Sequence, residues 1–138
     1  MVKTETLAFP MRGNGEIRDI TGDVNDNLKK SGLKNGLVTV FVPGATGAVT
    51  TIENESGLVK DFRELMEKWI PSEKNYHHNL RWGDGNGHSH LRASLVGPSL
   101  AVPVVDGRMT LGTWQQIVLI DFDVRPRSRG IIVQIVGE

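Results

Sequence analysis

All four histidines of this chain lie in one short polar stretch, residues 76–97. The same stretch holds glycines at every second position from 83 to 87, which let the backbone turn tightly or approach a ligand closely. Imidazole nitrogens and carboxylate oxygens are zinc ligands, and imidazole also transfers protons near neutral pH. The stretch therefore predicts a metal site or a proton-transfer site. Its histidines and their polar neighbours are His77, His78, His88, His90, Asn79, Asp84, Asn86 and Ser89.

The spacing of His88 and His90 restricts how they can act together. Residues two apart face the same side of an extended chain, but in an α-helix they diverge by about 200°. The residues after Ser89 have a helical pattern that stops before Pro98, and Asn86 or Ser89 could cap its start. We therefore place both histidines at the entrance of this helix, facing back towards the first two histidines.

His78 is the expected third ligand of a metal ion held by His88 and His90, and the remaining histidine is expected to face solvent. Asp84 could position the metal or move a proton, and Asn86 belongs to the same expected pocket. The alternative is a polar surface loop whose histidines only form hydrogen bonds.

The composition limits the classes of function. A chain of 138 residues fits a single domain, residues 1–138, and a formal net charge of zero gives no whole-molecule attraction to nucleic acid or to an anionic membrane. Because there is no cysteine, disulfides and thiolate ligands are excluded and zinc would be held by nitrogen and oxygen. Neither a signal peptide nor a membrane-spanning apolar run is present, so we expect a cytoplasmic protein.

The hydrophobic pattern predicts an α+β fold, a single domain dominated by antiparallel β-sheet, sandwich-like, with two or three helices. Apolar residues recur every fourth position around Val24, and residues 56–69 carry an apolar stripe opposite a charged face. Residues 36–42 are apolar on both faces and predict a central strand. The other expected strands cover residues 2–10, 16–20, 45–52, 99–105, 108–111, 113–123 and 130–136.

The expected strand over residues 113–123 is apolar on both faces. Val118 and Ile120 lie on one face, and Ile117 and Leu119 lie on the other. Because a chain with few helices has little to cover the second face, we expect another subunit to cover it and predict a homo-oligomer.

Arg125, Arg127 and Arg129 alternate near the end of the chain, where residues two apart share a face. Guanidinium groups on one rim could bind a phosphate or pyrophosphate bidentately, and we assign Arg127 and Arg129 to this role. The alternative is a solvated turn whose arginines pair with Asp121 and Asp123.

Two further places could contribute to a pocket. Glycine within a strand pattern marks a bulge or a close backbone approach, so Thr113, Trp114 and Gln115, which follow Gly112, could form a pocket floor or could simply be packed. Glu53 ends a strand before a helix, where a carboxylate serves as ligand, base or helix-start acid.

Several motifs together resemble one known family. They are Tyr-x-His-Asn at 76–79, Asn-Gly-His-Ser-His-Leu-Arg-Ala-Ser at 86–94, Gly-Pro-Ser-Leu-x-Val-Pro at 97–103, Gly-Arg-x-x-Leu-Gly-Thr-Trp-Gln-Gln-Ile at 107–117 and Arg-Pro-Arg-Ser-Arg at 125–129. The chain resembles the YjbQ-like family, also called secondary thiamine-phosphate synthases. The resemblance implies an α+β fold dominated by antiparallel sheet, a homotrimer, a histidine-lined metal site near a subunit boundary and a weak thiamine-phosphate synthase activity.

By motif match His78, His90 and Glu53 fall on positions that the family uses, and His88 matches only some members. Many members also have a histidine followed by threonine in the strand after the first helix, where this chain reads Pro43-Gly44-Ala45-Thr46.

These observations give one hypothesis and two alternatives. The first is a transferase that joins hydroxymethylpyrimidine diphosphate to thiazole phosphate, with zinc at the histidines, magnesium for the diphosphate, and Glu53 or Asp84 as proton carriers. The second is a zinc-dependent hydrolase of another small substrate. The third is a non-catalytic oligomeric ligand-binding protein.

Overall fold

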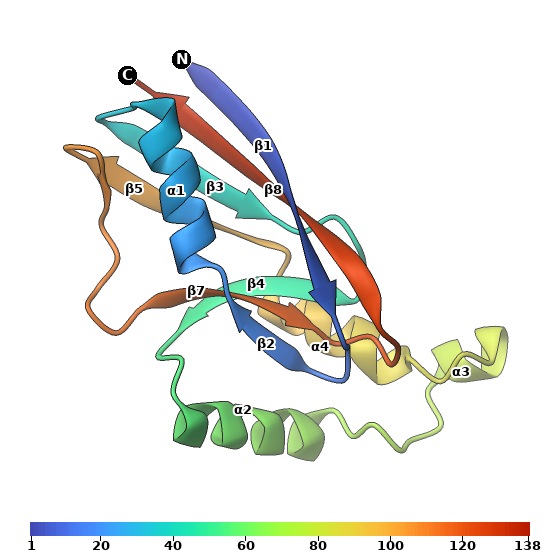
Figure 1. Ribbon diagram of the computed structural model, residues 1–138. Coiled ribbons are helices and arrows are strands. Elements are labelled where there is room, and N and C mark those ends of the chain that lie inside the picture. Colours follow the sequence, from blue (N-terminus) through green and yellow to red (C-terminus); the bar gives the residue numbers. More distant parts are fainter.

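The eight strands of the chain form two antiparallel sheets, and the computed structural model describes residues 1–138 throughout (Figure 1). The larger sheet has the order β1-β8-β3-β5-β6, and the smaller has the order β2-β7-β4. The expected antiparallel α+β fold is therefore confirmed. The strands are β1 (Val2–Met11), β2 (Glu16–Asp19), β3 (Gly36–Phe41), β4 (Gly47–Ile52), β5 (Ser99–Val105), β6 (Arg108–Met109), β7 (Gln116–Asp121) and β8 (Arg127–Gly137).

Four helices are present instead of the two or three that the sequence predicts. They are α1 (Thr21–Ser31), α2 (Ser56–Trp69), α3 (His77–Trp82) and α4 (Gly87–Val96). The unexpected helix is α3, which is too short to show a helical apolar period and ends at Gly83 in the left-handed conformation. None of the helices is long and apolar enough to span a bilayer.

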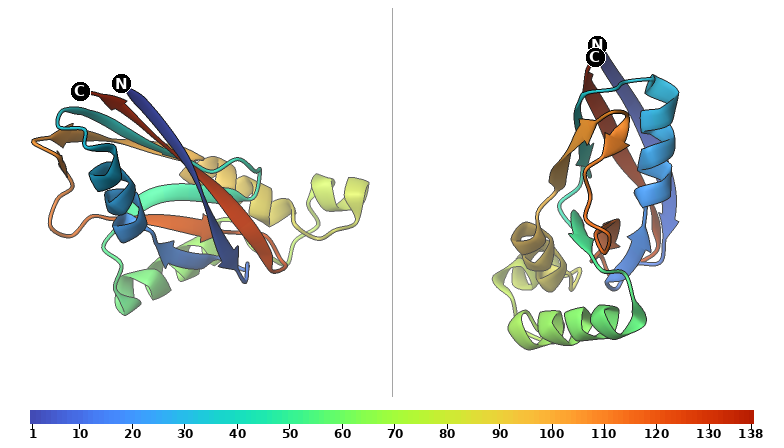
Figure 2. Two further views of the ribbon diagram at one scale, coloured as in Figure 1. Left: turned by 45° about the horizontal axis from the view of Figure 1, so that its top comes forward. Right: turned by 90° about the vertical axis from the view of Figure 1, so that its left-hand side faces the viewer.

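The smaller sheet lies between α1 with the larger sheet on one side and α2 with α4 on the other (Figures 1 and 2). Each side of the smaller sheet packs in a hydrophobic core. On one side, Ile117 and Leu119 of β7 pack in a core that also holds Val24 and Leu28 of α1 and the inner face of the larger sheet. On the other side, β7 packs in a smaller core with Met66 of α2 and residues of α4. This second layer brings α4 against β4.

Both faces of β7 are therefore covered by the chain itself, and the argument that β7 needs another subunit is wrong. The uncovered surface is the outer face of the larger sheet, where Leu37, Phe41, Val105 and Val136 are exposed. The homo-oligomer itself stays a prediction, and the outer face of the larger sheet replaces β7 as the surface that would form the interface.

Candidate functional site

His78 on α3 and His90 on α4 lie against each other. Their ring centroids are 4.4 Å apart and the ring planes are inclined by 44°. Nδ1 of His78 lies 3.7 Å from Oδ1 of Asp84, which follows α3. The predicted meeting of His78 with His90 is confirmed, and Asp84 joins the pair.

His88 does not join this pair. Helix α4 starts at Gly87, two residues before the predicted helical pattern, so His88 and His90 both lie in its first turn. Helical geometry directs them to different sides, and His88 is buried while His90 is partly exposed. The prediction that the two rings share a side is therefore wrong.

The surroundings of His88 disfavour its charged form. Burial lowers the pKa of His88, and the positive charge of Arg92 lowers it further, although Glu67 and Asp123 oppose this shift. His88 is therefore held neutral to lower pH than an ordinary histidine.

The chain does not assemble a three-ligand metal site from its own side chains. No group of three or more His, Cys, Asp or Glu side chains is placed to hold a metal ion. The closest pair of nitrogen ligands is His78 with His90, and the set of His78, His88 and His90 is not brought together. Zinc at these histidines stays a prediction.

Asn79 holds the start of α4 in place. Its Oδ1 accepts the N–H of Gly87 at 2.8 Å, so a side chain of α3 caps the first turn of α4. A Cβ on Gly87 would lie 2.7 Å from Cβ of Tyr76, so the close contact of the two segments requires glycine. Neither predicted cap acts: Asn86 forms no cap hydrogen bond, and Ser89 Oγ is buried without a partner.

Asn86 is buried between two carboxylates, those of Asp84 and Asp123. Its Nδ2 donates to Oδ1 of Asp123 at 3.4 Å, and turning the amide over would direct it to Oδ1 of Asp84 at 3.0 Å. The amide of Asn86 thus donates to either Asp123 or Asp84, depending on its orientation. Burial would raise the pKa of Asp123, but hydrogen bonds from Val124 N–H, Asn86 and Thr46, with the charge of Arg129, bring it below its ordinary value.

The arginines do not form the predicted rim. Arg129 is only 1% exposed and donates through Nε and Nη2 to the fully buried carboxylate of Asp121, at 3.1 and 2.8 Å. Arg127 is exposed, and its Nη1 lies 3.6 Å from Oδ2 of Asp123. The alternative pairing with Asp121 and Asp123 is confirmed, except that the Arg129 pair is buried rather than solvated. Phosphate binding by either arginine stays a prediction.

Thr46 belongs to this network although its sequence context gave no signal. Its hydroxyl accepts a hydrogen bond from Nη2 of Arg129 at 2.6 Å and donates one to Oδ2 of Asp123 at 3.2 Å. A threonine in a turn gives no sign of such partners, because both lie more than 70 residues away.

His90 faces a pocket of about 260 Å³ that we name the His90 pocket. Its walls come from the turn over residues 44–47 and from α4, and nearly all of them are small. The lining residues are Gly44, Ala45, Gly47, His90, Ala93, Ser94 and Pro98. The pocket therefore combines one imidazole with unobstructed backbone.

Glu53 lies beyond the other end of β4. That strand leads away from Gly47 in the His90 pocket and rises roughly 3.3 Å per residue, so its ends are about 17 Å apart. The role of helix-start acid belongs to Glu55, which caps α2 by accepting from the N–H of Gly57 and of Leu58.

Thr113, Trp114 and Gln115 also lie at this far end. They form a turn before β7 instead of part of a strand, and Trp114 is 70% exposed. Gln115 accepts the N–H of Gly112 and donates to Thr51. Within one chain, these residues and the histidine pair belong to separate sites.

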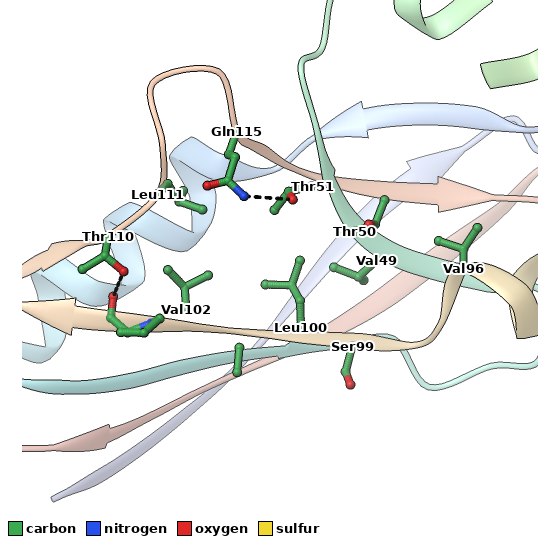
Figure 3. Close-up of a pocket in the computed structure, with 12 residues that line it drawn as sticks. Val49, Thr50, Thr51, Val96, Ser99, Leu100, Val102, Thr110, Leu111 and Gln115 are labelled. Atoms are coloured by element: carbon green, nitrogen blue, oxygen red, sulfur yellow. Dashed lines mark hydrogen bonds between the residues drawn. The ribbon is translucent and has the colours of Figure 1, made fainter. Parts of the chain in front are cut away.

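Gln115 lines a second pocket of about 290 Å³ between β4 and β5 (Figure 3). Aliphatic side chains such as Leu100 and hydroxyls such as that of Thr51 surround it, and no charged residue does. Because it has no acid, base or ion, this second pocket offers no group for acid–base catalysis.

The fold and the His90 pocket together define a small antiparallel α+β domain with a site formed by two adjacent histidines at the start of a helix. The chain belongs to the YjbQ-like family: the family model described as UPF0047 protein YjbQ-like matches residues 5–138. A UPF0047 protein of Methanothermobacter thermautotrophicus is 41% identical over 99% of this chain and 94% of that protein. One from Archaeoglobus fulgidus is 43% identical over 86% of this chain and 90% of its own length.

Solved structures agree with this assignment. A YbjQ-like protein of unknown function from Sulfolobus solfataricus superimposes with a TM-score of 0.90 at 34% identity, covering 100% of both chains. A hypothetical protein from Aeropyrum pernix gives 0.92 at 35% identity, covering 99% of both.

Proposed function

We propose that this protein is an enzyme that acts on a small phosphorylated substrate at the His90 pocket. The observation that carries the proposal is the contact of His78 with His90, beside Asp84 and at the wall of a pocket. A carboxylate beside an imidazole fixes the orientation of the ring, which suits general acid–base catalysis. In this proposal His90 contacts the substrate, and Asp84 orients His78, which shares the proton.

The arginines supply the attraction for phosphate. Arg125 and Arg127 border an open hollow with Asp123 and Ser128. Exposed guanidinium groups bind phosphate oxygens strongly because both N–H groups of the fork can donate. Arg127 is therefore the proposed surface contact of the phosphorylated substrate.

The specific reaction to test first is thiamine-phosphate synthesis, which the family resemblance suggests. The descriptions of the relatives name the family and no reaction, so the resemblance and the site chemistry are its support. Fixed positive charge, and magnesium on the diphosphate, would stabilise the departing pyrophosphate. Glu53, at the far end of β4, could contribute only from another copy.

A zinc-dependent hydrolase is the second candidate, because two adjacent imidazoles are part of a zinc ligand set. Its activity would follow zinc loading and release no pyrophosphate. A non-catalytic oligomeric binding protein is the third, and it predicts ligand binding without turnover.

The test uses untagged protein with the two phosphorylated precursors and magnesium or zinc. We expect His90→Ala to lower turnover by at least about 100-fold, the scale of general acid–base catalysis, and His77→Ala, an exposed neighbour on α3, to retain it. If wild type forms no product and does not complement a thiamine-phosphate synthase deletion, the synthase assignment is wrong. Metal analysis of the same sample tests the zinc alternative.

We also propose that the chain self-associates, as a homotrimer by family resemblance, through the outer face of the larger sheet. Exposed apolar residues of neighbouring strands support this, because Leu37 of β3 lies opposite Val136 of β8.

A further inference from the structure

Three buried side-chain atoms have no hydrogen-bond partner anywhere in the chain: Nδ1 of His88, Oγ of Ser89 and Nη1 of Arg129. They are the complete set of such atoms. The first two lie in the first turn of α4, and Arg129 is bonded to Thr46 in the turn that faces α4. Since buried polar groups are nearly always paired, their concentration at one junction needs a physical cause.

The hydrogen-bond balance shows which kind of partner is missing. Arg129 has five N–H donors, of which Nε and Nη2 supply three bonds, to Asp121 and Thr46. The nearby carboxylates are already served: Asp121 also accepts the N–H of Asp123, and Asp123 accepts from Thr46 and from Val124. Both N–H groups on Nη1 of Arg129 are left over. Nη1 of Arg129 can only donate and therefore lacks an acceptor, whereas Nδ1 of His88 and Oγ of Ser89 can each donate or accept.

Nη1 of Arg129 lies directly behind the wall of the His90 pocket. A Cβ built on Gly44 would lie 2.8 Å from Nη1, and one built on Gly47 would lie 3.5 Å from it. Both glycines line the pocket. Two residues without side chains, Gly44 and Gly47, therefore lie between the unpaired guanidinium donors and the pocket.

We propose that the end of the His90 pocket against the 44–47 turn is an oxyanion subsite that takes the phosphoryl group of the substrate. Its oxygens lie over the two glycines, in front of the unpaired Nη1 of Arg129, while His90 lies on the other wall. The pocket volume of about 260 Å³ suits a small anion better than a drug-sized molecule. This inference rests on the proposed function and specifies its substrate end.

Inorganic phosphate is the probe, titrated calorimetrically against the full chain at constant ionic strength. Ala45→Asp adds a negative charge at an exposed position of the pocket wall, and we expect it to raise the phosphate dissociation constant at least about tenfold, since like charges repel at close range. Gly22→Asp makes the same charge change on α1, where a Cβ meets no other atom, and should bind like wild type.

A third variant separates the subsite from the reaction. His78→Ala removes a proton-transfer partner that does not line the pocket, so it should lose turnover and keep phosphate affinity. Wild type that does not bind phosphate, or an Ala45→Asp variant that binds it as wild type does, overturns the subsite. Phosphate binding that depends on Ala45, with no turnover of any phosphorylated substrate, supports the subsite and refutes only the proposed reaction.

Discussion

At the residue scale, the Asp121–Arg129 pair stabilises the junction behind the His90 pocket. Asp121 is 0% exposed and Arg129 is 1% exposed, so losing one partner leaves an uncompensated charge in the interior. We expect Asp121→Asn to lower the free energy of unfolding by about 3–5 kcal/mol, measured by urea denaturation. Arg12→Ala, which removes an exposed arginine from a surface pair with the half-buried Glu16, is the control and should change little. Equal effects of the two variants would contradict this account of the buried pair.

The lowered pKa of His88 predicts a pH dependence of stability. Its ordinary value is 6.5, so as the pH falls below this value the unfolded chain binds a proton that the folded chain resists, and stability decreases. Asp123 and Glu67 also have lowered pKa values, but their contributions are lost only below their ordinary values of 3.8 and 4.5. We expect His88→Gln to flatten the decline in melting temperature between about pH 7 and pH 5.

The exposed His77 provides the control for this pH series. His77→Gln removes an imidazole from the surface of α3 and should leave the slope between these pH values as in wild type. A His88→Gln variant that declines as steeply as wild type would show that another group causes the decline.

The sequence predicted the meeting of His78 and His90 but not the place of His88. The sequence alone shows that all the histidines lie in one stretch. Only a few residues join α3 to α4, so His78 and His90 are held close together. The direction of each ring depends on where α4 begins, and that is decided by Asn79 and by the packing of Gly87 on Tyr76. Likewise, the alternation of the arginines predicted that Arg129 shares a strand face with Arg127. The burial of Arg129 against Asp121, however, depends on tertiary packing that the sequence pattern does not show.

At the element scale, the cap from Asn79 connects the histidine pair to the stability of α4. Asn79→Ala frees the first N–H of α4, so we expect a loss of about 1 kcal/mol in stability and reduced turnover, because His90 lies in the same turn. Thermal unfolding and the precursor assay measure the two effects. Glu55→Ala removes the corresponding cap of α2, far from His90, and should lower stability with little effect on turnover. Equal loss of turnover in both variants would assign the effect to stability alone.

Elements with a local signal were predicted and those set by long-range contacts were not. The Asp106-Gly107 hairpin needs positive φ at both residues, and the structure has 50° and 76° there. The apolar strand over residues 36–42 is central, between β8 and β5. In contrast, no apolar periodicity in the sequence predicts α3. Strand β7 begins later than predicted because Gln115 forms a turn with Gly112.

At the scale of the whole molecule, one face of the larger sheet has no cover. The apolar residues of β7 that suggested an oligomer are buried by two internal cores, a layering that single-strand patterns do not show. Leu37 and Phe41 of β3 alternate with Val38 and Val40 and point away from the core. On neighbouring β8, Val136 lies opposite Leu37, which makes the exposed surface continuous across strands.

A continuous apolar face of this kind marks an association surface, and a second copy of the chain is the occupant that we propose. Light scattering after gel filtration should give three chain masses for wild type, and Leu37→Lys should give one, because it places a charge on the apolar face that forms the proposed interface. Leu65→Lys on α2 is the matched control: Leu65 is 39% exposed and Leu37 is 40% exposed, but α2 lies on the other side of the smaller sheet. A monomeric wild type, or a Leu37→Lys variant that keeps its mass, would show that this face is not the interface.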